Sequence, residues 1–200
     1  MSDGAPEFDS YWQRVVDEVE ALRDSPVDIT ELPLRSNEVS IAYSAAFQGI
    51  GGYPLFAYIS VPRGDGPFPA LFQAPPYGSV VAVPDHDRRR RYAVMALCHR
   101  GQRVSDLGYS AQYPGLLTDG LPDADRYRWR DIVADCLRAV DVLAAQTEAD
   151  EGRLAAAGND LAAIIAALRP SVRFLLLNGQ LLFRDGPASL SQSGAYPHQE

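Results

Sequence analysis

Residues 153–170 read RLAAAGNDLAAIIAALRP, and this stretch decides the fold. A short apolar run leads into Gly158, Asn159 and Asp160, and a second apolar segment follows until Pro170. The first run predicts a short buried strand, and the segment 161–169 predicts a helix. A carboxylate therefore stands at a sharp bend between a strand and a helix, and its purpose there has to be explained.

Such a bend needs small residues two positions before and two positions after its apex, because these positions meet neighbouring backbone. Gly158 and Ala162 satisfy this need around Asp160. The apex side chain projects at the end of the sheet, and the backbone N–H of Leu161 is placed to help form an oxyanion hole. Asp160 is then either a nucleophile held ionised by the helix end or the N-cap of that helix, and local sequence favours the cap.

The rest of the chain alternates between strand and helix patterns. Apolar residues at three- and four-residue spacing predict helices over 8–23 and 131–144. Two β-rich runs, 38–47 and 54–62, flank a glycine-rich turn and predict an antiparallel hairpin. Continuous apolar runs predict buried parallel strands over 70–75, 93–101 and 172–179. Together these patterns predict an α/β protein with a mostly parallel sheet and an antiparallel N-terminal hairpin.

Two polar stretches depart from this alternation. The run DHDRRRRY at 85–92 could contact phosphate, but its adjacent acidic residues favour a solvated helix start. Residues 184–200 are polar and rich in Gly, Pro and Ser, which predicts a poorly ordered tail.

The composition excludes several classes of function. A length of 200 residues with 46% hydrophobic residues predicts one domain over 1–200. The net charge of −8 argues against nucleic acid and anionic membranes as partners. All 18 basic residues are arginine, which excludes lysine-based catalysis and a P-loop lysine. Cys98 and Cys136 lack metal-ligand spacing and are expected to be buried hydrophobes.

The N-terminus has no basic and apolar leader, and no run approaches the ~20 apolar residues of a membrane span. These features predict a cytoplasmic protein.

The order of three segments resembles the acetyl xylan esterase / cephalosporin-C deacetylase family of α/β-hydrolases. That family carries an Arg-Gly-Gln motif followed by Ser and an acidic residue, a Tyr-Arg-rich start to a long helix, and an Asp-Glu-x-Arg lead-in to its nucleophile elbow. The residues that match the first motif and approximate the lead-in are Arg100, Gly101, Gln102, Ser105, Asp106, Glu151 and Arg153. The resemblance covers roughly residues 8–180.

The resemblance implies an α/β-hydrolase fold and hydrolysis of small acyl esters, such as acetyl groups on sugars, with no cofactor or metal. Asp160 takes the nucleophile position, and the backbone N–H groups of Leu161 and Tyr77 become the oxyanion donors. Without the resemblance, the sequence favours an ordinary tyrosine in a Pro-Gly turn at position 77. Arg100 and Gln102 are implied to be structural residues that fasten the loop below the site. Family members commonly self-associate, so a homo-oligomer is expected.

Two departures from the family weigh against efficient catalysis. The family has serine where this chain has Asp160, and it draws its triad acid and histidine from segments beyond the elbow. His86 and His99 precede the elbow and His198 lies in the polar tail, so none takes the family's base position. The expected domain is therefore incomplete, with the C-terminal part of the fold missing.

Three functions stay open from the sequence. The first is an impaired acetyl-ester hydrolase. The second is an inactive hydrolase-fold protein used for binding or assembly, or a fragment of a longer enzyme. The third is an aspartate-nucleophile hydrolase of the dehalogenase or epoxide hydrolase type, for which Asp160 has the right position.

Overall fold

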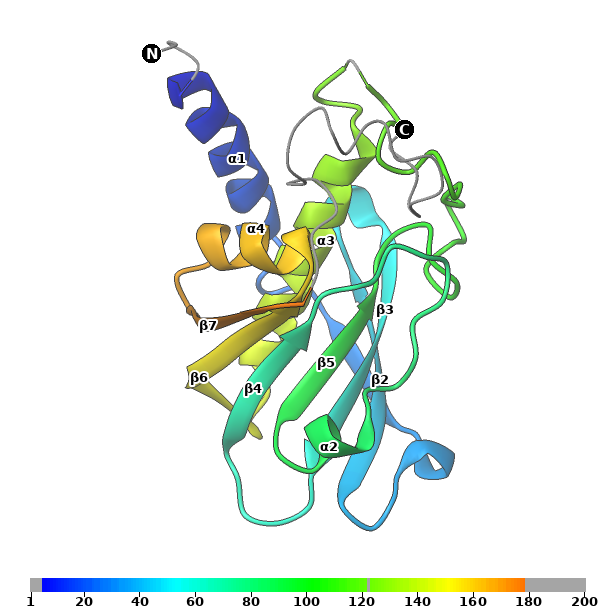
Figure 1. Cartoon of the computed structure of the whole chain (residues 1–200), viewed down its shortest axis with the longest axis vertical. Helices are drawn as coiled ribbons and strands as arrows, with labels where there is room; N and C mark the ends of the chain where they lie inside the picture. Colours follow the sequence, from blue (N-terminus) through cyan, green and yellow to red (C-terminus); the bar gives the residue numbers. More distant parts are fainter. Residues whose placement is uncertain (1–4, 122, 179–200) are drawn as a thin grey trace.

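A computed structural model describes residues 5–121 and 123–178 (Figure 1). Its centre is a seven-stranded sheet with the order β1-β2-β3-β5-β4-β6-β7. The strands are β1 (Val27–Glu31), β2 (Ser40–Gln48), β3 (Pro54–Pro62), β4 (Phe68–Gln73), β5 (Ala93–Cys98), β6 (Ala149–Gly158) and β7 (Val172–Leu177). The α-helices are α1 (Ala5–Glu20), α2 (His86–Arg89), α3 (Arg128–Ala144) and α4 (Asp160–Leu168). Two short 3₁₀ turns, Pro33–Arg35 and Ile50–Gly52, flank β2.

The sheet has an antiparallel and a parallel part. Three pairs of neighbouring strands are antiparallel: β1 with β2, β2 with β3, and β3 with β5. The neighbours β5, β4, β6 and β7 are all parallel. The predicted hairpin is confirmed, because β2 and β3 pair from Gln48 opposite Pro54 to Ser40 opposite Pro62. The strand β1 was not predicted.

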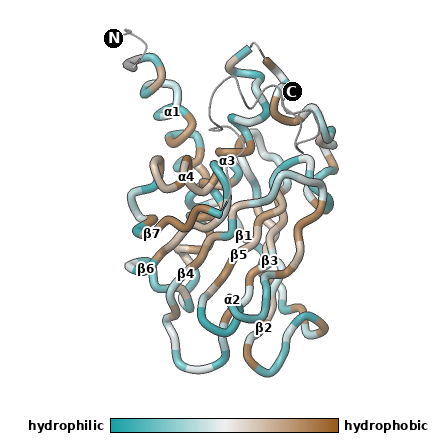
Figure 2. The backbone as a smooth tube through the Cα atoms, in the orientation of Figure 1, coloured by the Kyte–Doolittle hydropathy of each residue, from teal (hydrophilic) through white to brown (hydrophobic). Residues whose placement is uncertain are grey.

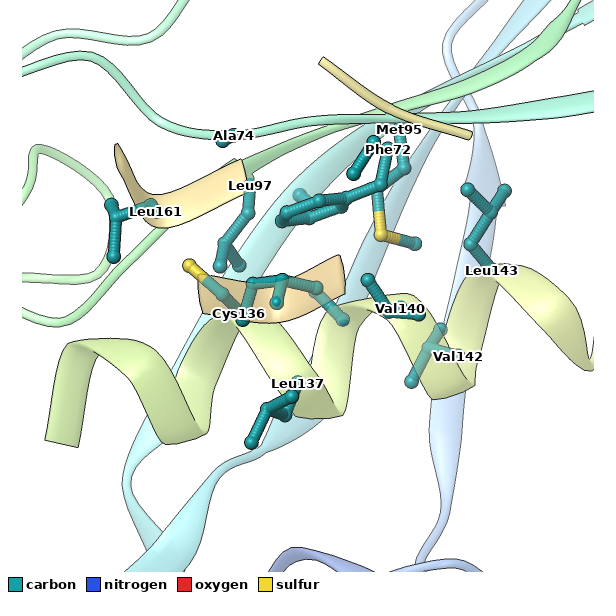
Figure 3. Close-up of a cluster of buried hydrophobic side chains, with 14 of the residues drawn as sticks. Phe72, Ala74, Met95, Leu97, Cys136, Leu137, Val140, Val142, Leu143 and Leu161 are labelled. Atoms are coloured by element: carbon teal, nitrogen blue, oxygen red, sulfur yellow. The ribbon is translucent and has the colours of Figure 1, made fainter. Parts of the chain in front are cut away.

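One face of the sheet carries the main core. The helix α3 packs on β4, β5 and β6, while α4 packs on β6 and β7, and α1 packs on α3. Figure 3 shows Phe72, Met95 and Leu97 of the sheet pointing towards Cys136 and Val140 of α3. Each of these five side chains is at most 1% exposed, so the interface between sheet and helix is dry. This burial holds β4 and β5 against α3.

Both cysteines are buried and are free thiols, as predicted. Burial raises the pKa of the Cys98 thiol to about 12, so it stays protonated and unreactive at neutral pH.

The basic run forms the short helix α2, capped by Asp85, whose side chain accepts a hydrogen bond from the Arg88 N–H at 3.0 Å. The prediction of a solvated helix start is confirmed for His86 and Asp87, which are exposed. Arg89 departs from it, because it is 9% exposed and donates to the Arg35 carbonyl.

The opposite face of the sheet carries a smaller apolar cluster of Leu71, Val94, Ala155 and Ala157, with Tyr92 packed against it. No helix in the described part of the chain has the length and apolarity required to cross a membrane. The predicted tail at 184–200 lies outside the described residues.

Candidate functional site

The elbow between β6 and α4 is shaped by backbone contacts with the neighbouring strand. Gly158 has a φ of +146°, a conformation that L side chains rarely adopt. A Cβ atom at this position would lie 2.9 Å from the Cβ of Ala74, which follows β4. The Ala74 N–H donates to the Ala157 carbonyl at 2.9 Å, and the Asn178 N–H donates to the Gly158 carbonyl at 2.9 Å. Glycine is therefore required where the chain leaves the sheet.

Asp160 is the first residue of α4 and is 1% exposed. The helix is capped by Asn159, whose Oδ1 accepts a hydrogen bond from the Leu161 N–H at 3.0 Å. The interpretation of Asp160 as the N-cap is therefore wrong, because Asn159 has the extended backbone and the accepting side chain that define the cap. The carboxylate of Asp160 lies instead in the first turn, where the helix dipole favours negative charge.

The Leu161 N–H, the first candidate oxyanion donor, is thus occupied by the side chain of Asn159. An ester oxygen can receive this N–H only when the Asn159 side chain turns away. Sequence reasoning missed this contact, although an asparagine close to the start of an apolar helical segment is a frequent capping signal.

Tyr77, the second candidate donor, lies in the loop after β4, the strand next to the elbow. Its ring packs edge-on against the ring of Tyr113, with centroids 5.2 Å apart. The buried side chain of Gln102 fastens this loop on both sides of Tyr77, because its Nε2 donates to the carbonyls of Pro76 at 3.1 Å and Gly78 at 2.7 Å. Gln102 Oε1 also accepts the His99 N–H at 3.0 Å. One amide side chain therefore joins the ends of β4 and β5.

Arg100 forms a buried ionic network below these loops. Its guanidinium donates to both carboxylate oxygens of Asp135 on α3, at 2.9 and 2.7 Å, and its backbone N–H donates to Asp135 at 3.0 Å. Asp131 lies 2.9 Å from Nη1, and the guanidinium stacks 4.7 Å from the centre of the Tyr53 ring. Burial raises the pKa of Asp135, and Arg100 opposes that shift by stabilising the carboxylate.

The two acidic partners of Arg100 were not identified from the sequence. Asp131 and Asp135 are four residues apart and therefore lie on the same side of α3. A charged residue inside the buried stripe of a predicted helix is the signal that pointed to a buried partner.

Gly101 and Ser105 complete the Arg-Gly-Gln segment. Gly101 has a φ of +83°, and a Cβ atom there would lie 2.7 Å from the ring of Tyr109 and 2.8 Å from Ala111. The Ser105 hydroxyl accepts the Phe56 N–H at 3.0 Å, so this serine ties the loop to β3. The segment fastens the carboxyl end of β5 to its surroundings.

Neither of the two described histidines, His86 and His99, is placed as a base beside Asp160. His86 is exposed on α2, which precedes β5 and lies at the opposite end of the sheet from α4 (Figure 1). His99 is 1% exposed, and its Nδ1 lies 2.6 Å from the Arg100 carbonyl oxygen. Burial lowers the pKa of His99 to about 4, so its ring is neutral at pH 7. His198 lies outside the described residues. Across 5–121 and 123–178, no cluster of three or more potential metal ligands occurs.

The mixed sheet, the helix layer and the β6–α4 elbow together define an α/β-hydrolase fold. The chain matches the acetyl xylan esterase (AXE1) family over residues 2–178. It therefore belongs to the acetyl xylan esterase family, as its sequence motifs predicted.

Known proteins similar to this chain carry related names. The acetyl esterase Axe7A of Xylanibacter ruminicola is 21% identical over 211 residues, which is 96% of this chain and 47% of that protein. The solved structure of acetyl xylan esterase 1 from a Thermoanaerobacterium species is 25% identical, with a TM-score of 0.71 over 84% of this chain and 56% of that one. The structure of an acetyl xylan esterase from a Paenibacillus species is 20% identical, with the same TM-score of 0.71 over 84% of this chain and 58% of that one. The chain thus spans about half the length of these relatives.

Proposed function

We propose that this protein hydrolyses small carboxylic esters, such as acetyl groups on sugars, at the β6–α4 elbow. The observation that carries the proposal is the elbow itself, which places the carboxylate of Asp160 at a helix N-terminus beside the fastened Tyr77 loop. Membership of the acetyl xylan esterase family supports the ester class, because the similar proteins are named as acetyl esterases.

The proposed roles follow from the position of each group. Asp160 stands at the nucleophile position. The N–H groups of Leu161 and Tyr77 are proposed to donate to the carbonyl oxygen as it gains negative charge. The first of these donors becomes available when Asn159 releases it. Arg100 and Gln102 are proposed to hold the two loops and not to touch the ester.

The expected turnover is slow. The family's serine is replaced by Asp160, and neither His86 nor His99 is placed as its base. Removing one member of a catalytic triad typically costs ~10⁴-fold in rate, and the remaining rate comes from oxyanion donors and binding. We therefore expect hydrolysis well below that of a serine esterase.

The test is hydrolysis of a chromogenic acetate ester by the purified, folded protein. Asp160→Ala removes the carboxylate and Asp160→Ser introduces the family's residue, while Asp28→Ala, at an exposed position on β1, is the matched control. Turnover above the buffer rate that disappears only in Asp160→Ala supports the proposal. Absence of turnover in the wild type and in Asp160→Ser would refute it.

A second candidate is an inactive hydrolase-fold protein that binds an ester without cleaving it. The contact between Asn159 and the Leu161 N–H favours this candidate, because it occupies a donor that catalysis needs. Calorimetric titration with an acetylated xylo-oligosaccharide distinguishes the two, since binding without product release identifies the second. Self-association and a cytoplasmic location remain predictions.

A further inference from the structure

The β6–α4 elbow is closed in this structure. Asp160 at its apex is 1% exposed, and Leu161 beside it is 2% exposed. In a working nucleophile elbow the turn from strand to helix is strained, and it exposes the apex side chain. Among residues 5–121 and 123–178, a positive φ occurs outside glycine only at Val104, so the backbone of Asp160 is not strained in this way. The closed elbow keeps the apex carboxylate away from an ester.

Asn159 makes the contacts that keep the elbow closed. Its backbone is extended, with a φ of −90° and a ψ of −154°, and its Oδ1 accepts the Leu161 N–H at 3.0 Å. Its carbonyl accepts the Ala162 N–H at 2.9 Å, so α4 begins with Asp160 as an ordinary helical residue. The same Oδ1 takes the place that an ester oxygen would take on the Leu161 N–H. One side chain therefore caps the helix and occupies the donor.

The helix itself is held by apolar contacts that do not involve Asn159. Apart from Asp160, every residue of α4 is alanine, leucine or isoleucine, and the helix has hydrophobic colours in Figure 2. Leu161, Ala162 and Ile165 are all buried in the main core. Because these contacts anchor α4, release of the Leu161 N–H requires only that the Asn159 side chain rotates.

We propose that Asn159 is an autoinhibitory latch on the elbow. The inference rests on the proposed function, because it assigns the regulation of the same site. In the latched state the Asn159 side chain holds the Leu161 N–H, and in the released state this N–H donates to the ester carbonyl oxygen. The net strength of one such hydrogen bond corresponds to a shift of about two- to tenfold in an equilibrium, and the latch lowers kcat/KM by about this factor. Asn159 acts through Leu161 and does not touch the ester.

Asn37 offers a matched control for the loss of this contact. Its Oδ1 accepts the N–H of Val39, two residues further on, at 3.0 Å, which is the geometry of the latch. Asn37 precedes β2, and the strand pairing places this start of β2 at the amino end of β5. The elbow lies at the carboxyl end of β6, which runs parallel to β4 and β5. Asn37 is therefore at the opposite end of the sheet.

The first test compares kcat/KM for a chromogenic acetate ester in variants of the full 200-residue chain. Asn159→Ala and Asn159→Gly remove the accepting oxygen, and glycine is the better tolerated cap, so it preserves the fold if alanine does not. We expect both to raise kcat/KM about two- to tenfold. Asn159→Asp keeps an accepting oxygen and should not exceed the wild type, and Asn37→Ala should equal it. Far-UV circular dichroism confirms that each variant is folded.

The second test does not require turnover. N-methylacetamide is a neutral amide that carries the same acetyl carbonyl group as the ester and resists hydrolysis. It is titrated into isotope-labelled protein while NMR follows the amide signal of Leu161. We expect this signal to shift at concentrations at least about twofold lower in Asn159→Ala and Asn159→Gly than in the wild type.

The two tests separate the latch from the proposed reaction. A Leu161 signal that responds more readily in Asn159→Ala than in the wild type supports the latch even where neither protein hydrolyses the ester, and only the proposed hydrolysis then fails. An equal response, or none, in the wild type and both variants overturns the latch. Measurable hydrolysis that Asn159→Ala and Asn159→Gly leave unchanged or lower, in folded protein, overturns it as well and leaves the proposed function standing.

Discussion

The ion pair between Arg100 and Asp135 predicts a large and specific loss of stability. Asp135→Ala removes the acceptor of three hydrogen bonds from Arg100, at 3.0, 2.9 and 2.7 Å. The side chain of Asp135 is 0% exposed and that of Arg100 is 6% exposed, so water does not replace the lost partner. Breaking a buried pair by removing one member costs about 3–5 kcal/mol.

The remaining contacts set the value within that range. Arg100 keeps Asp131 at 2.9 Å, which argues for the lower end, about 3 kcal/mol. One kcal/mol lowers the midpoint of a domain of this size by about 2–4 °C, so the expected shift is about 6–12 °C. Replacing both residues, as in Arg100→Met with Asp135→Leu, removes the stranded charge and should recover most of the loss.

Urea unfolding followed by circular dichroism measures these free energies in the wild type, in the single variants Asp135→Ala and Arg100→Met, and in the double variant. Asp28→Ala, at an exposed position on β1, controls for loss of a carboxylate as such and should change stability by less than about 0.5 kcal/mol. A loss below about 1 kcal/mol in Asp135→Ala would contradict the reasoning. So would a double variant no more stable than the two single variants.

Three further predictions concern the residues around the elbow. Burial lowers the folded-state pKa of His99 from 6.5 to about 4, so between these two pH values the unfolded chain binds a proton that the folded chain does not. The free energy of unfolding should therefore fall by about 3 kcal/mol as the pH drops to 4. Urea melts across this pH range measure the fall, which should be smaller in His99→Gln. Gln102→Ala leaves two backbone carbonyls and one backbone N–H without their partner, so it should lower the free energy of unfolding by about 1–3 kcal/mol and abolish any ester hydrolysis. Ester hydrolysis at the wild-type rate in a folded Gln102→Ala variant would contradict the positioning role of Gln102. Gly158→Ala places a Cβ atom 2.9 Å from the Cβ of Ala74 at a φ of +146° and should lower the free energy of unfolding by about 1–3 kcal/mol. In Gly78→Ala the added Cβ atom meets open space, so this control should be nearly neutral. Equal thermal midpoints for the two variants would refute the steric argument.

Most of the sheet could be predicted because its strands carry strong local signals. The hairpin β2–β3 and the strands β4, β5, β6 and β7 were all expected near their observed positions. The prediction that the last of them is buried is wrong, because β7 lies at the edge of the described sheet and five of its six residues are exposed. The strand β1 was missed because its sequence, VDITE, is short, and four of its five residues are exposed. The order of the strands was not predicted either, since an apolar run shows that a strand is buried but not which strands flank it.

In the candidate site, too, local patterns were predicted and contacts between distant segments were not. The small residues around Asp160 and the family motif indicated the elbow, the Tyr77 loop and the Arg-Gly-Gln segment. The partners that hold them depend on contacts between distant segments, such as Arg100 with Asp135, and no spacing rule reveals these. Asn159 and Asp160 are neighbours and both residue types cap helices well, so the local sequence did not distinguish which of them is the cap.

The contacts that shape the elbow have a consequence for how activity and folding relate. They come from the backbone of Gly158, from Ala74 and Asn178, and from the side chain of Asn159. A change at position 160 leaves all of these contacts in place. The shape of the elbow is therefore set by residues other than the one at its apex. A substitution at position 160 changes the chemistry of the apex while the backbone contacts that form the elbow are kept.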